Sequence, residues 1–239
     1  MKVLYRITNG GNNKSKPKFV YDKKKMFLHF ISIFAKSNEV FVFADNVNED
    51  LYLFMISNYD PSKIIRTSLG NSKSFMFTLD FAISTFEENE AIYFAEDDYI
   101  YKVGADKIIA EGLTIADYSS GYDHPDKYIN CSEGGPNPFV ENGGELTRVL
   151  VSNNSHWKLT NSFCMTFAST VKVLKGDYNT FAEHCMFNND PSDFVLFCHL
   201  SRACSRKLVT CIPSVCTHGE TEWLAKFIDW EKEFNISLC

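Results

Sequence analysis

The sequence predicts an α/β protein built on an open, mainly parallel sheet, followed by a mixed second half. Over about residues 1–100, short apolar runs alternate with amphipathic stretches, as in repeated β-α units. The run 39–44, EVFVFA, is apolar at nearly every position, which is typical of a strand buried on both faces of a parallel sheet. Beyond residue 100 the alternation gives way to Gly- and Pro-rich loops and isolated apolar segments. No linker separates the two parts, so we expect one domain over 1–239, divided at about 1–100 and 101–239.

The first half is expected to contain four strands and three helices in strict alternation. The strands are expected at 2–8, 39–44, 62–67 and 91–95. The helices are expected at 22–37, 49–58 and 74–86. The first helix has Asp22 as its expected N-cap and apolar residues at helical spacing from Met26 to Phe34.

The second half is expected to be loops and strands with few helices. The segments 116–128, 132–144, 145–153 and 156–170 are interpreted as loops and mixed strands. A helix is expected at 191–207, capped by Ser192 or Asp193, and the tail 211–234 is expected to be a loop followed by a short helix.

Composition disfavours several classes of partner. The net charge is −6 and Lys23-Lys24-Lys25 is the longest basic tract, so duplex nucleic acid is not expected as a partner. We interpret these three lysines as a solvated helix face. No apolar run approaches the roughly 20 residues of a membrane span, and the N-terminal residues lack the pattern of a signal peptide. We therefore expect a cytoplasmic protein, in the host cytoplasm if the source is a virus.

Most of the eight cysteines are expected to be free thiols in that compartment. Four of them gather in the sequence with two histidines, without any CxxC pair: Cys198, Cys204, Cys211, Cys216, His199 and His218. A structural zinc site there is a minor hypothesis. His184 is interpreted as structural.

Three consecutive carboxylates follow the fourth expected strand, in the stretch YFAEDDYIY. In an open α/β sheet, ligands bind beyond the C-terminal ends of the strands, where Glu96, Asp97 and Asp98 would lie. On an extended chain Glu96 and Asp98 would face one way and Asp97 the other. Such carboxylates suit a hard cation, Mn²⁺ or Mg²⁺, that is shared with the phosphates of a substrate. The alternative is an acidic loop that caps a strand in solvent.

On these residues the chain resembles the GT-A glycosyltransferases, whose DxD motif has an E-D-D variant. DYSSGYDHPDKY and PSVCTHGETEWLAKFIDW resemble more narrowly a group of compact viral and bacterial enzymes, such as the chlorella virus glycosyltransferase domain. The general resemblance covers about 1–100 and the narrower one about 115–230. It implies a nucleotide-sugar donor, usually a UDP-sugar, bound by the first half, and an acceptor bound by the second. It also implies that Asp98 ligates Mn²⁺ or Mg²⁺, with Glu96 or Asp97 on the ribose or the metal's water.

The same resemblance indicates where the rest of the donor would bind. Contacts from the ends of the first two strands would come from Arg6, Thr8, Asn9 and Asp45. Arg6 has a surface charge as its alternative, and Asp45 a plain helix N-cap. The segment RTSLGNSKS precedes a helix, so its backbone N–H groups could bind an anion, with candidates Asn71, Ser72 and Ser74. The alternative there is an ordinary loop.

Acceptor-side candidates come from the second half. An inverting transfer needs a base on the acceptor hydroxyl, and NNDPSDF offers Asp190 and Asp193 at a helix start, of which we favour Asp193. Its alternative is a helix-capping role. His218 is a candidate third metal ligand or diphosphate contact, with a structural loop histidine as the alternative. Other candidates are Trp157 and Trp223 for stacking on sugars, although core packing is favoured for both, and Asp123 and His124 for the acceptor cleft.

The sequence therefore predicts a metal-dependent glycosyltransferase that uses a UDP-sugar and a glycan or other hydroxyl acceptor. The sugar, the acceptor and the stereochemistry stay open. One alternative is a sugar nucleotidyltransferase, although TNGGNNKSK is a weak imitation of its phosphate loop. The other is an inactive nucleotide- or sugar-binding module, against which the intact acidic triplet argues.

Overall fold

The computed structural model describes residues 1–10, 14–186 and 190–238. In the first half, strands and helices alternate as the sequence predicts, and the expected segments differ from them by only a few residues at each end. The elements are β1 (Lys2–Ile7), α1 (Lys23–Phe34), β2 (Glu39–Asp45), α2 (Glu49–Asn58), β3 (Ile64–Thr67), α3 (Asn71–Thr85) and β4 (Ala91–Glu96). The Asp22 side chain accepts from the N–H of Lys25, so the expected cap of α1 is confirmed.

The second half contains more regular structure than the sequence predicts. Its elements are β5 (Tyr99–Tyr101), α4 (Ala105–Gly112), β6 (Tyr118–Ser120), β7 (Val149–Val151), β8 (His156–Leu159), β9 (Phe167–Thr170), α5 (Val171–Gly176), α6 (Tyr178–Met186), α7 (Asp193–Arg202), β10 (Leu208–Ile212), β11 (Cys216–His218) and α8 (Trp230–Ser237). The helix expected at 191–207 ends at Arg202, and the tail expected to be loop and helix also contains strands. Strands β6 to β9 lie within the segments expected to hold mixed strands, whereas β5, β10, β11 and the helices α4, α5 and α6 were not expected. The short strands β5, β10 and β11 depend on partners far along the chain, so the local pattern did not indicate them.

In the described part of the chain, the main sheet has nine strands in the order β3-β2-β1-β4-β9-β6-β10-β8-β7. The first four are mutually parallel. Strand β9 then runs antiparallel to β4 on one side and to β6 on the other. The predicted class, a parallel first half joined to a mixed second half, is confirmed, and the sheet continues through both halves without a break.

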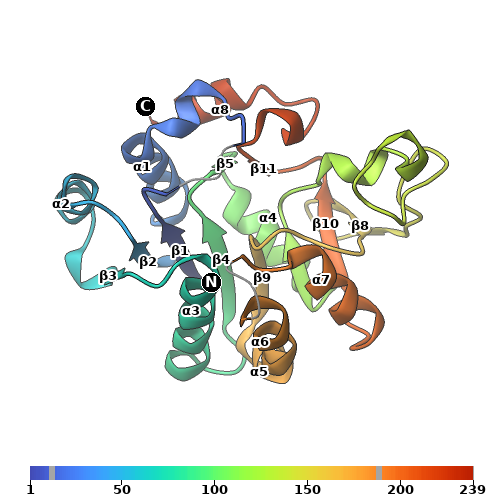
Figure 1. Ribbon diagram of the computed structural model, residues 1–239, viewed down its shortest axis with the longest axis horizontal. Coiled ribbons are helices and arrows are strands. Elements are labelled where there is room, and N and C mark those ends of the chain that lie inside the picture. The colour runs from blue at the N-terminus through green and yellow to red at the C-terminus, as the bar shows by residue number, and fades with distance from the viewer. Residues whose placement is uncertain (11–13, 187–189, 239) are drawn as a thin grey trace.

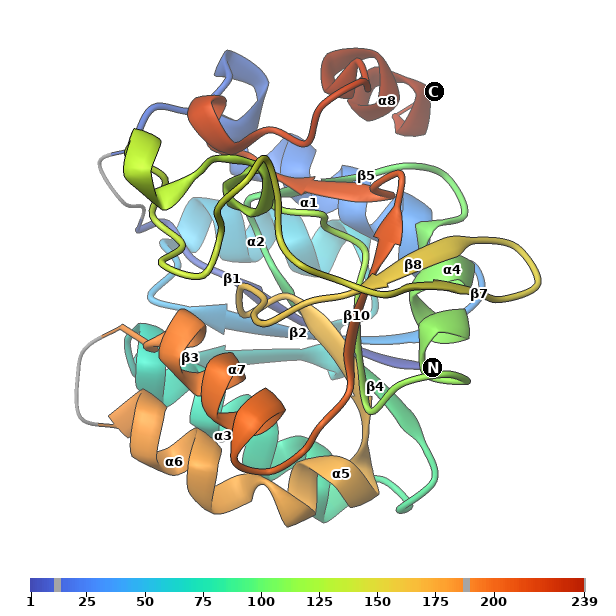
Figure 2. The same ribbon diagram turned by 90° about the vertical axis from the view of Figure 1, so that its right-hand side faces the viewer.

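Helices cover both faces of the sheet (Figures 1 and 2). Side chains alternate in direction along β1, so Val3 and Tyr5 pack with α1, α2, α4 and α8, whereas Leu4 packs with α3, α5, α6 and α7. Tyr5 stacks on Phe30 of α1 with ring centroids 3.9 Å apart. The two apolar clusters pack the parallel strands between two helical layers. Both faces of the sheet are covered, so the C-terminal ends of the strands are where a ligand can reach it.

A second, two-stranded sheet lies outside the main one, where β5 pairs antiparallel with β11 (Figure 1). The register places His218 opposite Tyr99, the residue that follows the acidic triplet. A segment from near the C-terminus is thereby held beside the end of β4. No described helix is both long and apolar enough to cross a lipid bilayer.

Candidate active site

A cavity of about 940 Å³ lies at the C-terminal edge of the parallel strands. Its walls include the ends of β1, β2 and β4, the loop before α3, the start of α7 and the residues after β11. This volume is within the roughly 300–1,000 Å³ of small-molecule sites, and the position is where open α/β sheets bind ligands. The acidic triplet, which is Glu96, Asp97 and Asp98, lines it.

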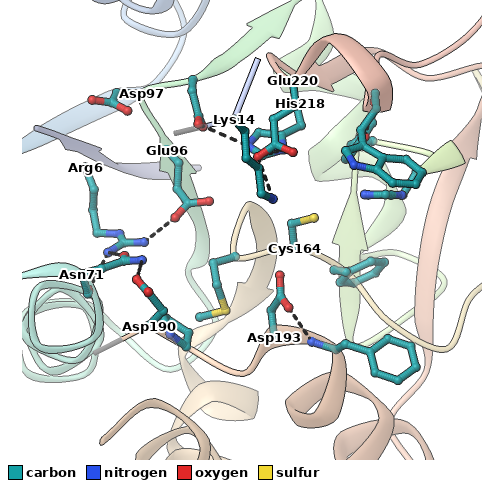
Figure 3. Close-up of a pocket in the computed structure, with 18 of the residues that line it drawn as sticks. Arg6, Lys14, Asn71, Glu96, Asp97, Cys164, Asp190, Asp193, His218 and Glu220 are labelled. Atoms are coloured by element: carbon teal, nitrogen blue, oxygen red, sulfur yellow. Dashed lines mark hydrogen bonds and ion pairs between the residues drawn. The ribbon is translucent and has the colours of Figure 1, made fainter. Parts of the chain in front are cut away.

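Glu96 ends β4 and forms an ion pair with Arg6 of β1, at 2.6 Å between Oε1 and Nη2. The parallel register puts Arg6 directly opposite Glu96, so the pairing follows from the sheet itself. Figure 3 shows Glu96 pointing toward Arg6. Burial raises the pKa of Glu96, while the Arg6 charge opposes the rise.

Asp97 and Asp98 form a turn between β4 and β5, so the expectation of an extended chain through the triplet is wrong. Asp97 lies 2.7 Å from Lys23 Nζ and accepts the N–H of Thr8 at 2.8 Å. Burial raises the pKa of Asp97, against the effect of Lys23. Lys23, which was expected on a solvated face, instead lines the cavity.

Asp98 lies between two cationic side chains. Its Oδ2 is 2.7 Å from Lys16 Nζ and 3.1 Å from His218 Nε2. Burial by itself would raise the pKa of Asp98, but His218 and Lys16 outweigh it and hold that pKa well below its usual value. In the same way, Asp98 raises the pKa values of His218 and Lys16 although burial lowers them. Each carboxylate of the triplet thus has its own basic partner, which is how three adjacent like charges coexist.

His218 reaches Asp98 because of the small sheet. The N–H of Gly219 also donates to the carbonyl of Asp98 at 2.7 Å. A Cβ at position 219 would lie 2.7 Å from that oxygen and 2.8 Å from a methyl carbon of Val20, so only glycine allows this approach. The residue type at position 219 therefore fixes the distance between the turn and β11.

On the donor side, Arg6 and Asn71 form one polar unit. Arg6 Nη1 donates to the backbone carbonyl of Asn71 at 2.9 Å and to its side-chain oxygen at 3.0 Å. The Asn71 amide in turn donates to Asp190 at 2.9 Å (Figure 3). Arg6 is only 7% exposed and its guanidinium lies over the Phe75 ring, so the surface-charge alternative for Arg6 is wrong.

Asp45 organises the loop that leads into α3. It is 5% exposed and accepts the N–H groups of Leu69 at 2.7 Å and Gly70 at 2.9 Å. The N-cap of α2 is Asn48, so the capping alternative for Asp45 is wrong. Asp45 is one of the cavity-lining residues.

The remaining donor candidates divide into two groups. Thr8 and Ser74 line the cavity. Asn9 and Ser72 are not among the lining residues: the Asn9 side chain accepts the N–H of Asn48, and Ser72 is buried, its hydroxyl without a partner in the described residues. Asn9 therefore serves the start of α2 rather than the cavity wall.

Asp193 begins α7 and lines the cavity, with its carboxylate directed inward beside Cys164 (Figure 3). Ser192 occupies the N-cap position without a side-chain cap hydrogen bond, and Asp193 is the acidic residue of the first turn, so the helix-dipole part of its alternative stands beside its place in the cavity wall. The Asp193 carboxylate accepts the neighbouring N–H of Phe194 at 2.7 Å. Burial raises the pKa of Asp193, while the hydrogen bond from Phe194 opposes the rise.

The other acceptor-side candidates are also separated by the structure. Trp223, Asp123 and His124 line the cavity, and the rings of Trp223 and His124 have centroids 5.1 Å apart. Trp157 is fully buried in a separate apolar cluster, which confirms its core role and excludes it from sugar stacking.

Asp98 and His218 together provide two of the ligand atoms that a divalent cation needs. A carboxylate oxygen suits Mn²⁺ and Mg²⁺, and the His218 imidazole favours a transition metal such as Mn²⁺ over Mg²⁺. No third His, Cys, Asp or Glu completes a compact set with them in the part of the chain that the structure describes. Further ligands would come from water or from a substrate, such as the phosphates of a nucleotide diphosphate.

Two further lining residues, Lys14 and Lys16, were missed by the sequence reasoning. They follow β1, so the same end-of-strand argument that selected Thr8 could have found them. The cysteine-based zinc hypothesis is not supported, because the only compact ligand group among the described residues is Glu183, His184 and His199.

Comparison with known proteins finds only distant similarity to solved structures. No family model and no curated protein matches the sequence. Among solved structures, the galactosyltransferase LgtC in complex with donor and acceptor sugar analogs has a TM-score of 0.43 at 6% identity, over 83% of this chain and 69% of that one. A CMP-2-keto-3-deoxy-manno-octonic acid synthetase complexed with CTP has a TM-score of 0.47 at 12% identity, over 89% and 91%. The 4-diphosphocytidyl-2C-methyl-D-erythritol synthase of Anaerococcus prevotii has a TM-score of 0.46 at 11% identity, over 99% and 94%. With scores this low, these similarities carry no weight for function.

Proposed function

We propose that this chain is a metal-dependent glycosyltransferase that uses a UDP-sugar and a hydroxyl acceptor such as a glycan. The observation that carries the proposal is the meeting of Asp98 and His218 at the C-terminal edge of the parallel strands, 3.1 Å apart and 120 residues apart in sequence. The resemblance of the acidic triplet to the E-D-D form of the DxD motif supports it independently.

The residues around the cavity have distinct parts in this proposal. Asp98 and His218 would hold Mn²⁺ or Mg²⁺, which when bound neutralises charge on the leaving diphosphate. Glu96 or Asp97 would contact the ribose of the donor or a water on the metal. Arg6 fixes the Glu96 carboxylate in position, and Asn71 in turn holds Arg6 by accepting two of its hydrogen bonds.

Asp193 is the proposed base. The acceptor oxygen forms a bond to the anomeric carbon as the bond from that carbon to the diphosphate breaks, and the hydroxyl proton passes to the Asp193 carboxylate. Asp193 lines the same cavity as the triplet but comes from α7, a different element from those that carry Asp98 and His218. Trp223, half-buried at the same cavity, offers an aromatic face to the acceptor.

Nucleotide binding tests the proposal directly. We expect UDP with Mn²⁺ to raise Tm more than GDP or CDP with Mn²⁺, and more than UDP with EDTA. At about 100 times Kd the gain is about 2.7 kcal/mol, roughly 5 °C or more for a chain of this size. Asp98→Ala should abolish the metal-dependent part, whereas Asp50→Ala, at an exposed carboxylate on α2, should keep it. Survival of the metal-dependent shift in Asp98→Ala would remove Asp98 from the site.

One observation favours a sugar nucleotidyltransferase as second candidate. Lys14 and Lys16 follow β1 and line the cavity, where a triphosphate-binding loop would need basic groups. In that case a nucleoside triphosphate, and not UDP, would give the largest metal-dependent rise in Tm, and pyrophosphate would be released with a sugar phosphate as cosubstrate.

A further inference from the structure

A second group of ligand atoms lies outside the cavity, between α6 and α7. It consists of Glu183 and His184 on α6 and His199 on α7, and one ligand atom from each lies within 4.8 Å of the other two. The two histidines are half-buried and Glu183 is exposed. The proposed glycosyl transfer uses none of the three.

The histidine geometry suits a shared ion. His184 Nε2 and His199 Nδ1 are 3.0 Å apart, and the ring planes are nearly perpendicular at 86°. Two Zn–N bonds of about 2.0–2.1 Å at a tetrahedral angle would put the nitrogens roughly 3.3–3.4 Å apart. A movement of a few tenths of an ångström therefore brings both nitrogens into ligand positions.

We propose that Glu183, His184 and His199 form a binding site for a zinc-like divalent transition metal that joins α6 to α7. Two imidazoles and one carboxylate are a donor set that zinc accepts, with water in the fourth position. The set differs from Asp98 and His218 in having two nitrogen donors, so it selects zinc rather than Mn²⁺ or Mg²⁺.

The position gives such an ion a structural task. The backbone carbonyl of His184 accepts the N–H of Ser192 at 3.1 Å. This hydrogen bond holds the C-terminal part of α6 next to the residue that precedes α7. Asp190 and Asp193 lie on and just after that connection and line the cavity. A metal bridge from α6 to α7 would therefore hold the acceptor wall in place from outside the cavity.

Zinc binding to the whole chain tests the site without any assay of activity. The chain is stripped with a chelator and dialysed against Zn²⁺ or Co²⁺, and bound metal, the cobalt absorption spectrum and Tm are measured. We expect one zinc per chain, a cobalt spectrum without a thiolate charge-transfer band, and a rise in Tm of roughly 5 °C or more at about 100 times Kd. A thiolate band would assign the ion to cysteines and overturn the proposal.

Variants locate the ion. His199→Gln and His184→Gln should lose the bound zinc, and Glu183→Gln, at an exposed position that leaves packing intact, should weaken binding about 10-fold. His156→Gln, at an exposed histidine of β8, is the matched control and should bind normally. Far-UV circular dichroism without metal checks that the variants fold. Unchanged zinc content in both histidine variants would overturn the proposal and leave a simple histidine–histidine hydrogen bond.

A last variant separates this site from the proposed active site. Asp98→Asn should keep the zinc bound at α6 and α7. Loss of zinc in Asp98→Asn with retention in His199→Gln would place the ion in the cavity and overturn the second site, while leaving the proposed function open.

Discussion

At the residue scale, the site depends on charge pairing around Asp98. This carboxylate is 9% exposed and has both Lys16 and His218 within hydrogen-bonding distance. The sequence placed Asp98 and His218 among the candidates, but not Lys16. A lysine side chain spans several ångströms, so its end point depends on the path of a loop that periodicity does not describe.

The first residue-scale prediction concerns Asp193. Asp193→Asn removes the proposed base but keeps the shape of the side chain, so UDP binding should stay near normal while transfer falls about 10²–10⁴-fold. Isothermal titration with UDP and Mn²⁺ measures the first quantity, and sugar transfer measures the second. Asp190→Asn is the comparison: its contact with Asn71 predicts a larger effect on UDP binding. Unchanged transfer in Asp193→Asn would remove Asp193 from the mechanism.

At the element scale, the small sheet of β5 and β11 brings the two ends of the site together. The sequence indicated the parallel strands well, because each buried strand has its own continuous apolar run. It did not indicate β5, since the three residues Tyr99–Tyr101 form a strand only by pairing with Cys216–His218. The local sequence pattern therefore could not predict where His218 lies, although its residue type made it a candidate ligand.

Gly219→Ala tests this element directly. The added methyl group would meet the Asp98 carbonyl at 2.7 Å, so β11 must move away from the turn and His218 away from Asp98. We expect a stability loss of about 1–3 kcal/mol and a weaker Mn²⁺-dependent response to UDP. Urea unfolding and the UDP titration measure the two effects.

Gly144→Ala is the control for that substitution. Its Cβ would have only the Lys127 carbonyl nearby, at 3.8 Å, and its φ needs no glycine. It should leave stability and the nucleotide response nearly unchanged. A Gly219→Ala protein that behaves like Gly144→Ala would show that the approach of β11 to the turn does not control the site.

At the scale of the whole molecule, His29 joins three distant parts of the chain. It lies on α1, its Nε2 accepts the N–H of Tyr101 on β5 at 2.9 Å, and its Nδ1 meets the Ser237 hydroxyl of α8. Burial lowers the pKa of His29 to about 3. The sequence placed this residue on a helix but gave no sign of its burial among polar partners.

His29 contributes to the pH dependence of global stability through that lowered pKa. Below the unfolded pKa of about 6.5, the unfolded chain binds a proton on His29 that the folded chain does not, so stability falls by about 1.4 kcal/mol per pH unit. The loss continues down to the folded pKa of about 3. Urea unfolding between pH 7 and 5 should show it, and His29→Gln should flatten the slope by about 2 kcal/mol over that range. An equal slope in His29→Gln and in the exposed-site control His156→Gln would refute the assignment.

Without metal or nucleotide, the Lys16 ammonium group lies where a cation bound to Oδ2 of Asp98 would lie. A cation bound at Oδ2 of Asp98 would displace the Lys16 ammonium group, which would then need another anion. A diphosphate beside the same carboxylate provides one. Binding of the metal and binding of the nucleotide would therefore favour each other. The affinity for each ligand should rise by the same factor when the other ligand is present.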